Sequence, residues 1–284
     1  MNLGIFAKTF SRPSLDGVLD AIVSHGLQYV QFNLVCAGLP TLPDSVPEHQ
    51  VKQIRQGFES RNLVMAAISG TFNMIHPDSG LRRENLRRLG VLAAACGALG
   101  TPVISLCTGS RDAADMWRSH PENSSPAAWD DLLRSMETAL RIAERHQITL
   151  GVEPEINNAV DCAAKARALL DHFRSPLLRV IMDPANLFHA GELPRMRRVL
   201  DHAFDLLGKD IVLAHAKDLS ADGDAGHEAA GTGLLDYDYY LELLTRSGFK
   251  GPLILHNLRE DQVESSTRFL REKLGKIKTP SLAR

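Results

Sequence analysis

Residues 149–186 read TLGVEPEINNAVDCAAKARALLDHFRSPLLRVIMDPAN, and this stretch decides the fold. It contains two short apolar runs, Thr149–Glu153 and Arg179–Asp183, on either side of the helically spaced segment Ala163–Phe173. Strands that are buried on both faces have such continuous apolar runs, because helices cover both faces of a parallel sheet. The stretch therefore predicts a strand–helix–strand unit with two parallel strands.

The same alternation extends over the whole chain. Six further apolar runs predict strands at Leu3–Ala7, Tyr29–Leu34, Val64–Ser69, Pro102–Cys107, Ile211–His215 and Pro252–His256. Further helical spacing is found at Ser14–His25, Arg82–Ala98, Ala127–Arg145, Tyr237–Ser247 and Gln262–Leu274. Eight such units in 284 residues are compatible with a doubly wound sheet or with a closed barrel.

The loop after the first run favours the barrel. A doubly wound nucleotide-binding protein should have a glycine-rich loop there, but this chain continues from Lys8 as KTFSRP, and its next glycine is Gly17. We therefore expect an α/β protein with a single (β/α)₈ TIM-barrel domain over residues 1–284, with 276–284 as a frayed tail. The irregular stretches 107–126 and 220–232 both follow predicted strands. We expect them on the catalytic face, either as lids or substrate walls or as mobile surface loops.

The composition excludes several classes of function. The chain has 32 basic and 34 acidic residues, so its net charge of −2 does not favour nucleic acid or an anionic membrane. Its first residues are interrupted by Lys8, Arg12 and Pro13, unlike a signal peptide or a membrane span. The four cysteines include no CxxC pair, which fits neither a thiolate metal cage nor a disulfide framework. We expect a cytoplasmic protein that binds a small molecule.

Side chains that can do chemistry follow the last four predicted strands. They are Glu153 and Glu155 after the fifth strand, Asp183 and Asn186 after the sixth, His215 and Lys217 at the seventh, and His256 at the eighth. In barrel enzymes, side chains at the carboxyl ends of the strands point into the mouth. The two-residue period of a strand directs Glu153 and Asp183 to the axis, and it places Leu213, His215 and Lys217 on one face.

Two carboxylates and two imidazoles in one confined mouth suit a divalent metal. Glu153, Asp183, His215 and His256 form a mixed oxygen and nitrogen set that fits Mn²⁺, Mg²⁺, Co²⁺ or Zn²⁺. Each residue alone also fits a structural role, such as a helix cap for Asp183. An inward carboxylate at Glu153 is harder to explain in this way, because a buried charge needs a cation or several hydrogen bonds.

The order of these motifs resembles the xylose-isomerase-like sugar phosphate isomerase/epimerase family. The resemblance covers nearly the whole chain and rests on Glu153, Asp183-Pro-Ala-Asn186, His215-Ala-Lys217-Asp218, Gly231-Thr-Gly233 and a helix that begins at Asp236. It implies one divalent metal at the ends of the last four strands, with Glu153, Asp183 and His215 as three ligands. The family's fourth ligand is usually a glutamate, and this chain has His256 in that position.

The resemblance also implies proton transfer next to the carbonyl of a small sugar, polyol or hydroxy-keto acid. Glu153 is the candidate base, His256 the partner acid, and Lys217 either holds an oxyanion or forms a structural ion pair. The candidate substrate-binding residues are Glu155, Asn186, His189, Asn73 and His76. Glu155 is an alternative base or a support for a ligand, and Asn186 stands where the family often has histidine.

Other functions fit the same scaffold. A dehydratase or lyase would use the same metal, and His256 in place of glutamate favours it. A non-catalytic sugar-binding protein would explain both His256 and Asn186. The family's DNA-repair endonucleases need several metals and a basic DNA track, which this sequence lacks. Family barrels are often dimers or tetramers, so the resemblance also implies a homo-oligomer.

Overall fold

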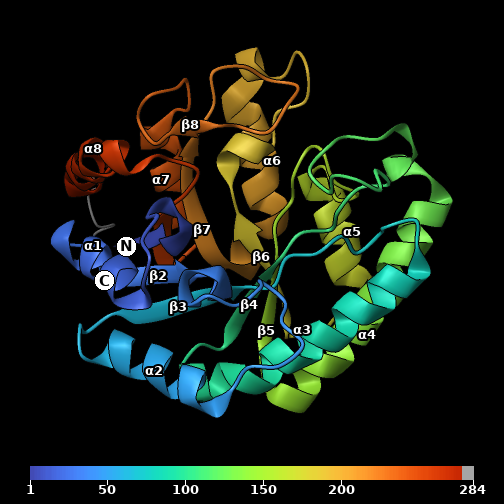
Figure 1. Cartoon of the computed structure of the whole chain (residues 1–284). Coiled ribbons are helices and arrows are strands. Elements are labelled where there is room, and N and C mark those ends of the chain that lie inside the picture. Colours follow the sequence, from blue (N-terminus) through green and yellow to red (C-terminus); the bar gives the residue numbers. More distant parts are fainter. Residues whose placement is uncertain (277–284) are drawn as a thin grey trace, which may run out of the picture.

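Eight parallel strands close into a barrel in the computed structural model, which describes residues 1–276 (Figure 1). The strands are β1 (Asn2–Phe6), β2 (Tyr29–Phe32), β3 (Val64–Ser69), β4 (Val103–Leu106), β5 (Thr149–Val152), β6 (Leu178–Met182), β7 (Ile211–Asp218) and β9 (Pro252–Leu255). Consecutive strands pair from β1 to β7, and β9 pairs with both β7 and β1. The ring is therefore closed, and the predicted (β/α)₈ barrel is confirmed.

Helices surround this barrel on the outside (Figure 1). They are α1 (Leu15–Ser24), α2 (Glu48–Glu59), α3 (Ser79–Leu99), α4 (Pro126–His146), α5 (Ala163–Phe173), α6 (Met196–Leu207), α7 (Tyr237–Arg246) and α8 (Val263–Lys276). Helices α2 and α6 are not among the helices expected from the sequence. Helix α2 buries only Ile54, Gly57 and Phe58, so its apolar stripe is thin. Of the tail predicted at 276–284, Lys276 ends α8, and residues 277–284 lie outside the described residues.

Shorter elements lie in the connections. Single turns of 3₁₀ helix occur at Ala7–Thr9, Leu34–Ala37, Pro121–Ser124, Pro184–Asn186, Leu193–Arg195, Gly208–Asp210 and Glu260–Gln262. The two-residue strand β8 (Glu228–Ala229) pairs antiparallel with the end of β7. It lies in the long stretch after β7 and ties that stretch to the barrel.

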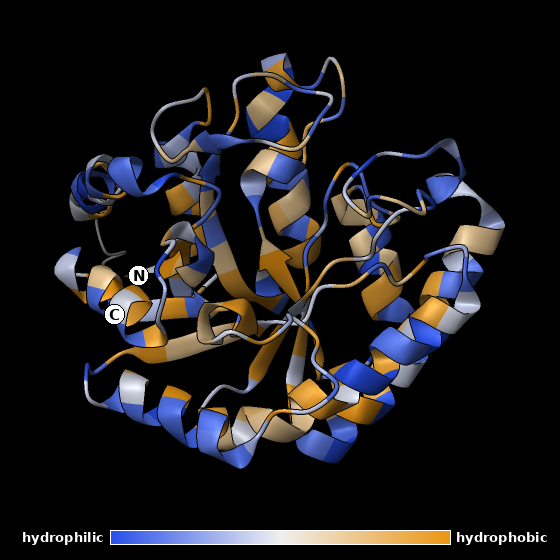
Figure 2. Ribbon diagram, in the orientation of Figure 1, coloured by the Kyte–Doolittle hydropathy of each residue, from blue (hydrophilic) through white to orange (hydrophobic). Residues whose placement is uncertain are grey.

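The core has two layers, one between strands and helices and one inside the barrel. Figure 2 shows largely apolar strands inside a ring of helices that carry many polar residues. The inner layer is formed by Ala67, Ile181, Leu213 and Ile254. Its packing leaves no room at Gly151, where an added Cβ would lie 2.8 Å from Ile181. Because Leu213 faces the interior, His215 and Lys217 face it too, as the strand period predicts.

Among residues 1–276, no helix combines the length and the apolar character that crossing a membrane requires.

Candidate active site

A cavity of about 870 Å³ opens at the carboxyl ends of the barrel strands. Side chains at or next to the strand ends line its inner part, among them Phe6, Gln31, Ser69, Ser105, Glu153, Lys217 and His256. The stretches after β4 and β7 line its rim with residues 115–119 and 223–225. Both long stretches therefore form walls of the cavity, one of the two roles expected from the sequence.

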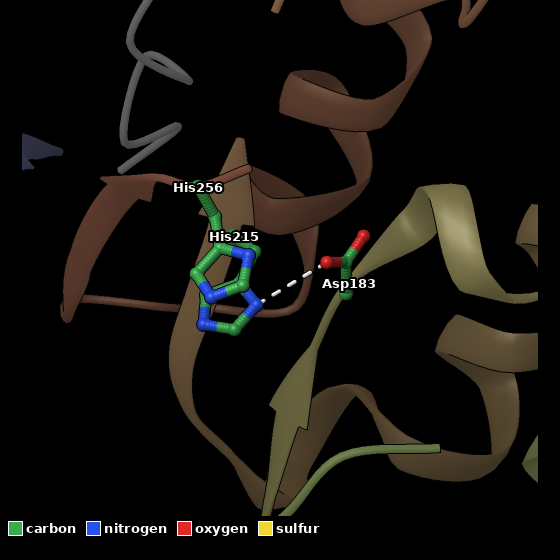
Figure 3. Close-up of side chains that lie close together, drawn as sticks. All are labelled: Asp183, His215 and His256. Atoms are coloured by element: carbon green, nitrogen blue, oxygen red, sulfur yellow. Dashed lines mark hydrogen bonds and ion pairs between the residues drawn. The ribbon is translucent and has the colours of Figure 1, made fainter. Parts of the chain in front are cut away.

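Three potential metal ligands lie close together (Figure 3), and one of them, His256, lines this cavity. Asp183 follows β6, His215 lies on β7 and His256 follows β9, and their ligand atoms all lie within 4.8 Å of one another. Asp183 and His215 are fully buried. The imidazole rings of His215 and His256 are stacked, with centroids 4.3 Å apart and planes 7° apart. This group could hold a metal ion.

Glu153 lies at the edge of the same group. Its Oε1 is 3.6 Å from Nδ1 of His215 and accepts a hydrogen bond of 2.7 Å from Nδ2 of Asn186. Of the four ligands expected from the sequence, the structure therefore groups Asp183, His215 and His256 together and places Glu153 beside His215. Their role as metal ligands remains a prediction.

Lys217 supplies a positive charge beside these acidic groups. Its Nζ is 3.2 Å from Oδ2 of Asp183 and donates a hydrogen bond of 2.6 Å to Oδ1 of Asn186. Burial raises the pKa of Asp183, but the charge of Lys217 and the hydrogen bond from His215 outweigh this and hold that pKa well below its ordinary value. Asp183 therefore remains ionised at neutral pH.

The two histidines have opposite electrostatic environments. Burial lowers the pKa of His215, but the charge of Glu153 and the bond to Asp183 raise it to about 9. Burial, with the charges of His215 and Lys217, lowers the pKa of His256 well below its ordinary value. His256 is therefore a neutral imidazole at physiological pH, which is the form that binds metals.

One nitrogen of His256 has no hydrogen-bond partner. Its Nδ1 is buried and unpaired within the described residues, although His256 as a whole is only half-buried. Buried polar atoms are nearly always paired, so an orphaned nitrogen calls for an explanation. A neutral imidazole beside two carboxylates is a suitable ligand for a divalent cation. The residues present therefore fit the metal that the sequence predicts.

Glu155 is a second carboxyl group on the wall of the cavity. It is buried, and its oxygens accept bonds from the backbone N–H of Asn157 and from Nδ2 of Asn158, at 3.1 and 3.0 Å. Burial raises its pKa to about 7, with an opposing contribution from Asn157 and an added rise from Glu153. Near neutral pH this group can therefore give or take a proton.

Three of the predicted substrate-binding residues do not line this cavity. Asn73 donates a hydrogen bond of 2.7 Å to the backbone oxygen of Ser110. Nε2 of His76 lies 3.2 Å from the backbone oxygen of Ala113. His189 lies 3.2 Å from the backbone oxygen of Asp161 and lines a separate cavity of about 350 Å³ beside α5 and α6. These side chains hold loops in place, and the geometry gives no support to substrate contacts. Asn186 and Glu155 do line the main cavity.

Two further residues of the site, Gln31 and Phe6, were not among the candidates expected from the sequence. Oε1 of Gln31 is 2.8 Å from Nε2 of His215. The ring of Phe6 stacks on His256, with centroids 4.9 Å apart. One signal was present, because Gln31 is a polar residue inside the apolar run YVQF and therefore has to find a buried partner.

Comparison with known proteins identifies relatives of this fold. The family model described as xylose isomerase-like TIM barrel matches residues 19–273. No curated protein sequence matches the chain.

Three solved structures illustrate the likeness. A D-tagatose 3-epimerase-like protein is 15% identical, with 97% of each chain covered and a TM-score of 0.77. The IOLI protein with a binding zinc atom is 17% identical, with 98% of this chain and 100% of that chain covered and a TM-score of 0.74. The probable 3-DHS dehydratase AsbF from Bacillus anthracis is 13% identical, with 95% of this chain and 99% of that chain covered and a TM-score of 0.72. At these identities the likeness shows the fold alone.

Proposed function

The chain belongs to the xylose isomerase-like TIM barrel family, and we propose that it is a metal-dependent isomerase or epimerase of a small sugar, polyol or hydroxy-keto acid. One observation carries the proposal. Asp183, His215 and His256 place their ligand atoms within 4.8 Å of one another, and one of these residues has an unpaired buried nitrogen. The D-tagatose 3-epimerase-like neighbour and the zinc-binding neighbour support it, since they share the fold.

Glu153 is the proposed base. A divalent cation bound by Glu153, Asp183, His215 and His256 would supply Lewis acidity to the carbonyl and adjacent hydroxyl of the substrate. Glu153 lines the cavity and would remove the proton from the carbon next to the carbonyl. The bond from Nδ2 of Asn186 orients the Glu153 carboxylate for this task.

Glu155 is the proposed partner for the return of the proton. His256 is the partner acid expected from the sequence, but its lowered pKa keeps it neutral and suits a ligand better than an acid. Glu155 lines the same cavity, and its pKa of about 7 leaves a protonated fraction at neutral pH. Lys217 directs its charge at Asp183 and Asn186, so we assign it to holding these two side chains.

The test combines metal analysis with a substrate screen. We expect a divalent metal in the purified protein, turnover of a ketose, an inosose or a hydroxypyruvate-like acid, and loss of turnover in excess EDTA. Glu153→Gln should lower kcat by about 10²- to 10⁴-fold, because a proton-transfer group is removed. Glu144→Gln changes an exposed glutamate on α4 and is the matched control. Full activity in excess EDTA, without metal by elemental analysis, would contradict the proposal.

A dehydratase is the second candidate. His256 in place of the glutamate found in the family's epimerases favours it, and the AsbF neighbour, a probable 3-DHS dehydratase, has the same fold. The product distinguishes the two reactions, because dehydration forms a conjugated carbonyl that absorbs in the ultraviolet and isomerisation does not. A sugar-binding protein without catalysis would bind metal and ligand but would show neither product.

A further inference from the structure

We propose that Gln31 is a positioning residue that fixes the tautomer and orientation of His215, so that Nδ1 of His215 is available to the metal. The inference rests on the proposed function, because it concerns the same metal group. It adds a residue from the opposite side of the barrel mouth. Its test is metal affinity, which is measured independently of turnover.

Gln31 makes a direct contact across the barrel mouth. It lies on β2, its side chain is buried, and its Oε1 is 2.8 Å from Nε2 of His215 on β7. An amide oxygen can only accept a hydrogen bond, so the proton in this contact belongs to Nε2 of His215. Within residues 1–276, Gln31 is the one hydrogen-bond partner of that nitrogen.

The opposite edge of the same ring faces the acidic group. Nδ1 of His215 lies 3.2 Å from Oδ2 of Asp183 and 3.6 Å from Oε1 of Glu153. Without the amide oxygen, these carboxylates would favour the tautomer whose single proton is on Nδ1, and that proton would occupy the position of a metal ion. In this structure Nδ1 donates to Asp183, and a bound metal would take the place of that proton. Because Gln31 accepts the proton on Nε2, Nδ1 is the nitrogen whose lone pair would then face the metal.

Among the described residues, no other hydrogen bond to Nε2 of His215 sets this preference. The stacked ring of His256 covers one face of His215 but makes no bond to Nε2. The hydroxyl of Tyr240 donates to the backbone oxygen of His215 at 3.0 Å, which holds the strand and not the ring. Gln31 is also the register partner of Phe6, which stacks on His256. Two neighbouring residues of β1 and β2 therefore hold the two histidines.

Zinc affinity tests the inference. The metal-free full chain is titrated with Zn²⁺ in competition with a chromophoric chelator, and the visible spectrum of Co²⁺ reports on ligand geometry. Gln31→Leu removes the acceptor and should weaken Zn²⁺ binding by about 10- to 100-fold. Gln31→Glu retains an acceptor and should bind Zn²⁺ at least as well as the wild type. Gln28→Leu, at the exposed residue before β2, is the control and should leave the affinity unchanged.

The outcomes separate this inference from the proposed function. A wild-type chain that binds no Zn²⁺ or Co²⁺ would overturn both. Zn²⁺ binding that is the same in the wild type and in Gln31→Leu would overturn only the role of Gln31. Equal losses in Gln31→Leu and Gln31→Glu would assign Gln31 to packing and would also overturn it. If Gln31→Leu does not fold, Gln31→Asn takes its place, because its shorter side chain withdraws the oxygen while remaining polar.

Discussion

The two halves of the barrel mouth present different groups to the cavity. Strands β1 to β4 contribute neutral side chains, namely Phe6, Gln31, Ser69 and Ser105. Strands β5, β7 and β9 contribute the ionisable side chains Glu153, Lys217 and His256, and the fully buried Asp183 and His215 lie behind them. One half therefore holds the groups suited to chemistry, and the other orients them and shapes the cavity.

Charges are also present on the first side, where Lys8, Asp115 and Arg118 come from the loops after the strands, and a further cluster of charges lies behind these loops. Asp131 on α4 accepts bonds from Arg82 and Arg134 at 2.7 and 2.6 Å, and it pairs with Arg111 at 2.8 Å. Arg111 in turn donates to the backbone oxygen of Ile75 at 2.8 Å. This ion cluster fixes the loops after β3 and β4. Charged residues on this side therefore also hold loops in place, away from the proposed ligands.

The charged half should give the largest change in stability. Lys217→Met leaves the buried carboxylate of Asp183 without a cation whose Nζ lies 3.2 Å away, and we expect the metal-free protein to lose about 3 kcal/mol in free energy of unfolding. Saturating Zn²⁺ should restore part of this loss, because it binds the folded state beside the same carboxylate. Urea unfolding in EDTA and in Zn²⁺ measures both values.

A more exposed ion pair provides the control for Lys217. Lys165→Met removes an ion pair in which Nζ of Lys165 lies 2.6 Å from Oδ2 of Asp161, but the lysine side chain is 31% exposed. The loss should stay below about 1 kcal/mol with or without Zn²⁺. If Lys217→Met lowered the free energy of unfolding equally in EDTA and in Zn²⁺, a bound metal would not replace the ammonium group of Lys217 beside Asp183.

The ion cluster behind the loops should give a smaller, pH-dependent change. Asp131→Asn should cost about 2 kcal/mol at neutral pH, since three arginines lose their carboxylate partner. Burial raises the pKa of Asp131, but bonds from Arg134 and Arg111 outweigh this and keep it below its ordinary value. Because the folded pKa lies below the unfolded value of about 3.9, the stabilisation is present above that pH and is lost as the pH falls through the folded pKa.

Urea unfolding of wild type and Asp131→Asn between neutral pH and acid checks this prediction. The two curves should converge in acid. Asp130→Asn, at the exposed neighbouring position, should behave as the wild type throughout. A difference at Asp131 that persists unchanged in acid would mean that packing, and not the charge, stabilises these loops.

The sequence predicted the barrel and the charged half of the mouth well. The apolar runs overlap all eight barrel strands, because strands covered on both faces leave a continuous pattern. Glu153, Asp183 and His256 each come directly after a strand, so strand position alone was enough to bring them together.

The neutral half was not predicted, for two physical reasons. The contact between Gln31 and His215 joins residues 184 positions apart, and no local spacing encodes it. Asn73 and His76 were chosen by residue type, but their side chains bond to the backbone of the loop after β4. Residue type indicates which groups can bind a substrate, whereas the direction of a loop side chain depends on contacts formed only in the fold.

The smallest effect is expected at Ser105 on β4, in the neutral half. Its Oγ is buried and has no hydrogen-bond partner within the described residues. Ser105→Ala removes an unpaired polar atom without breaking a bond, so the free energy of unfolding should rise or stay within about 1 kcal/mol of the wild type. Zn²⁺ affinity should not change, because Ser105 makes no hydrogen bond to a proposed ligand within residues 1–276. Urea unfolding and zinc titration check both points, and a large loss in either would place Ser105 among the groups that hold the site.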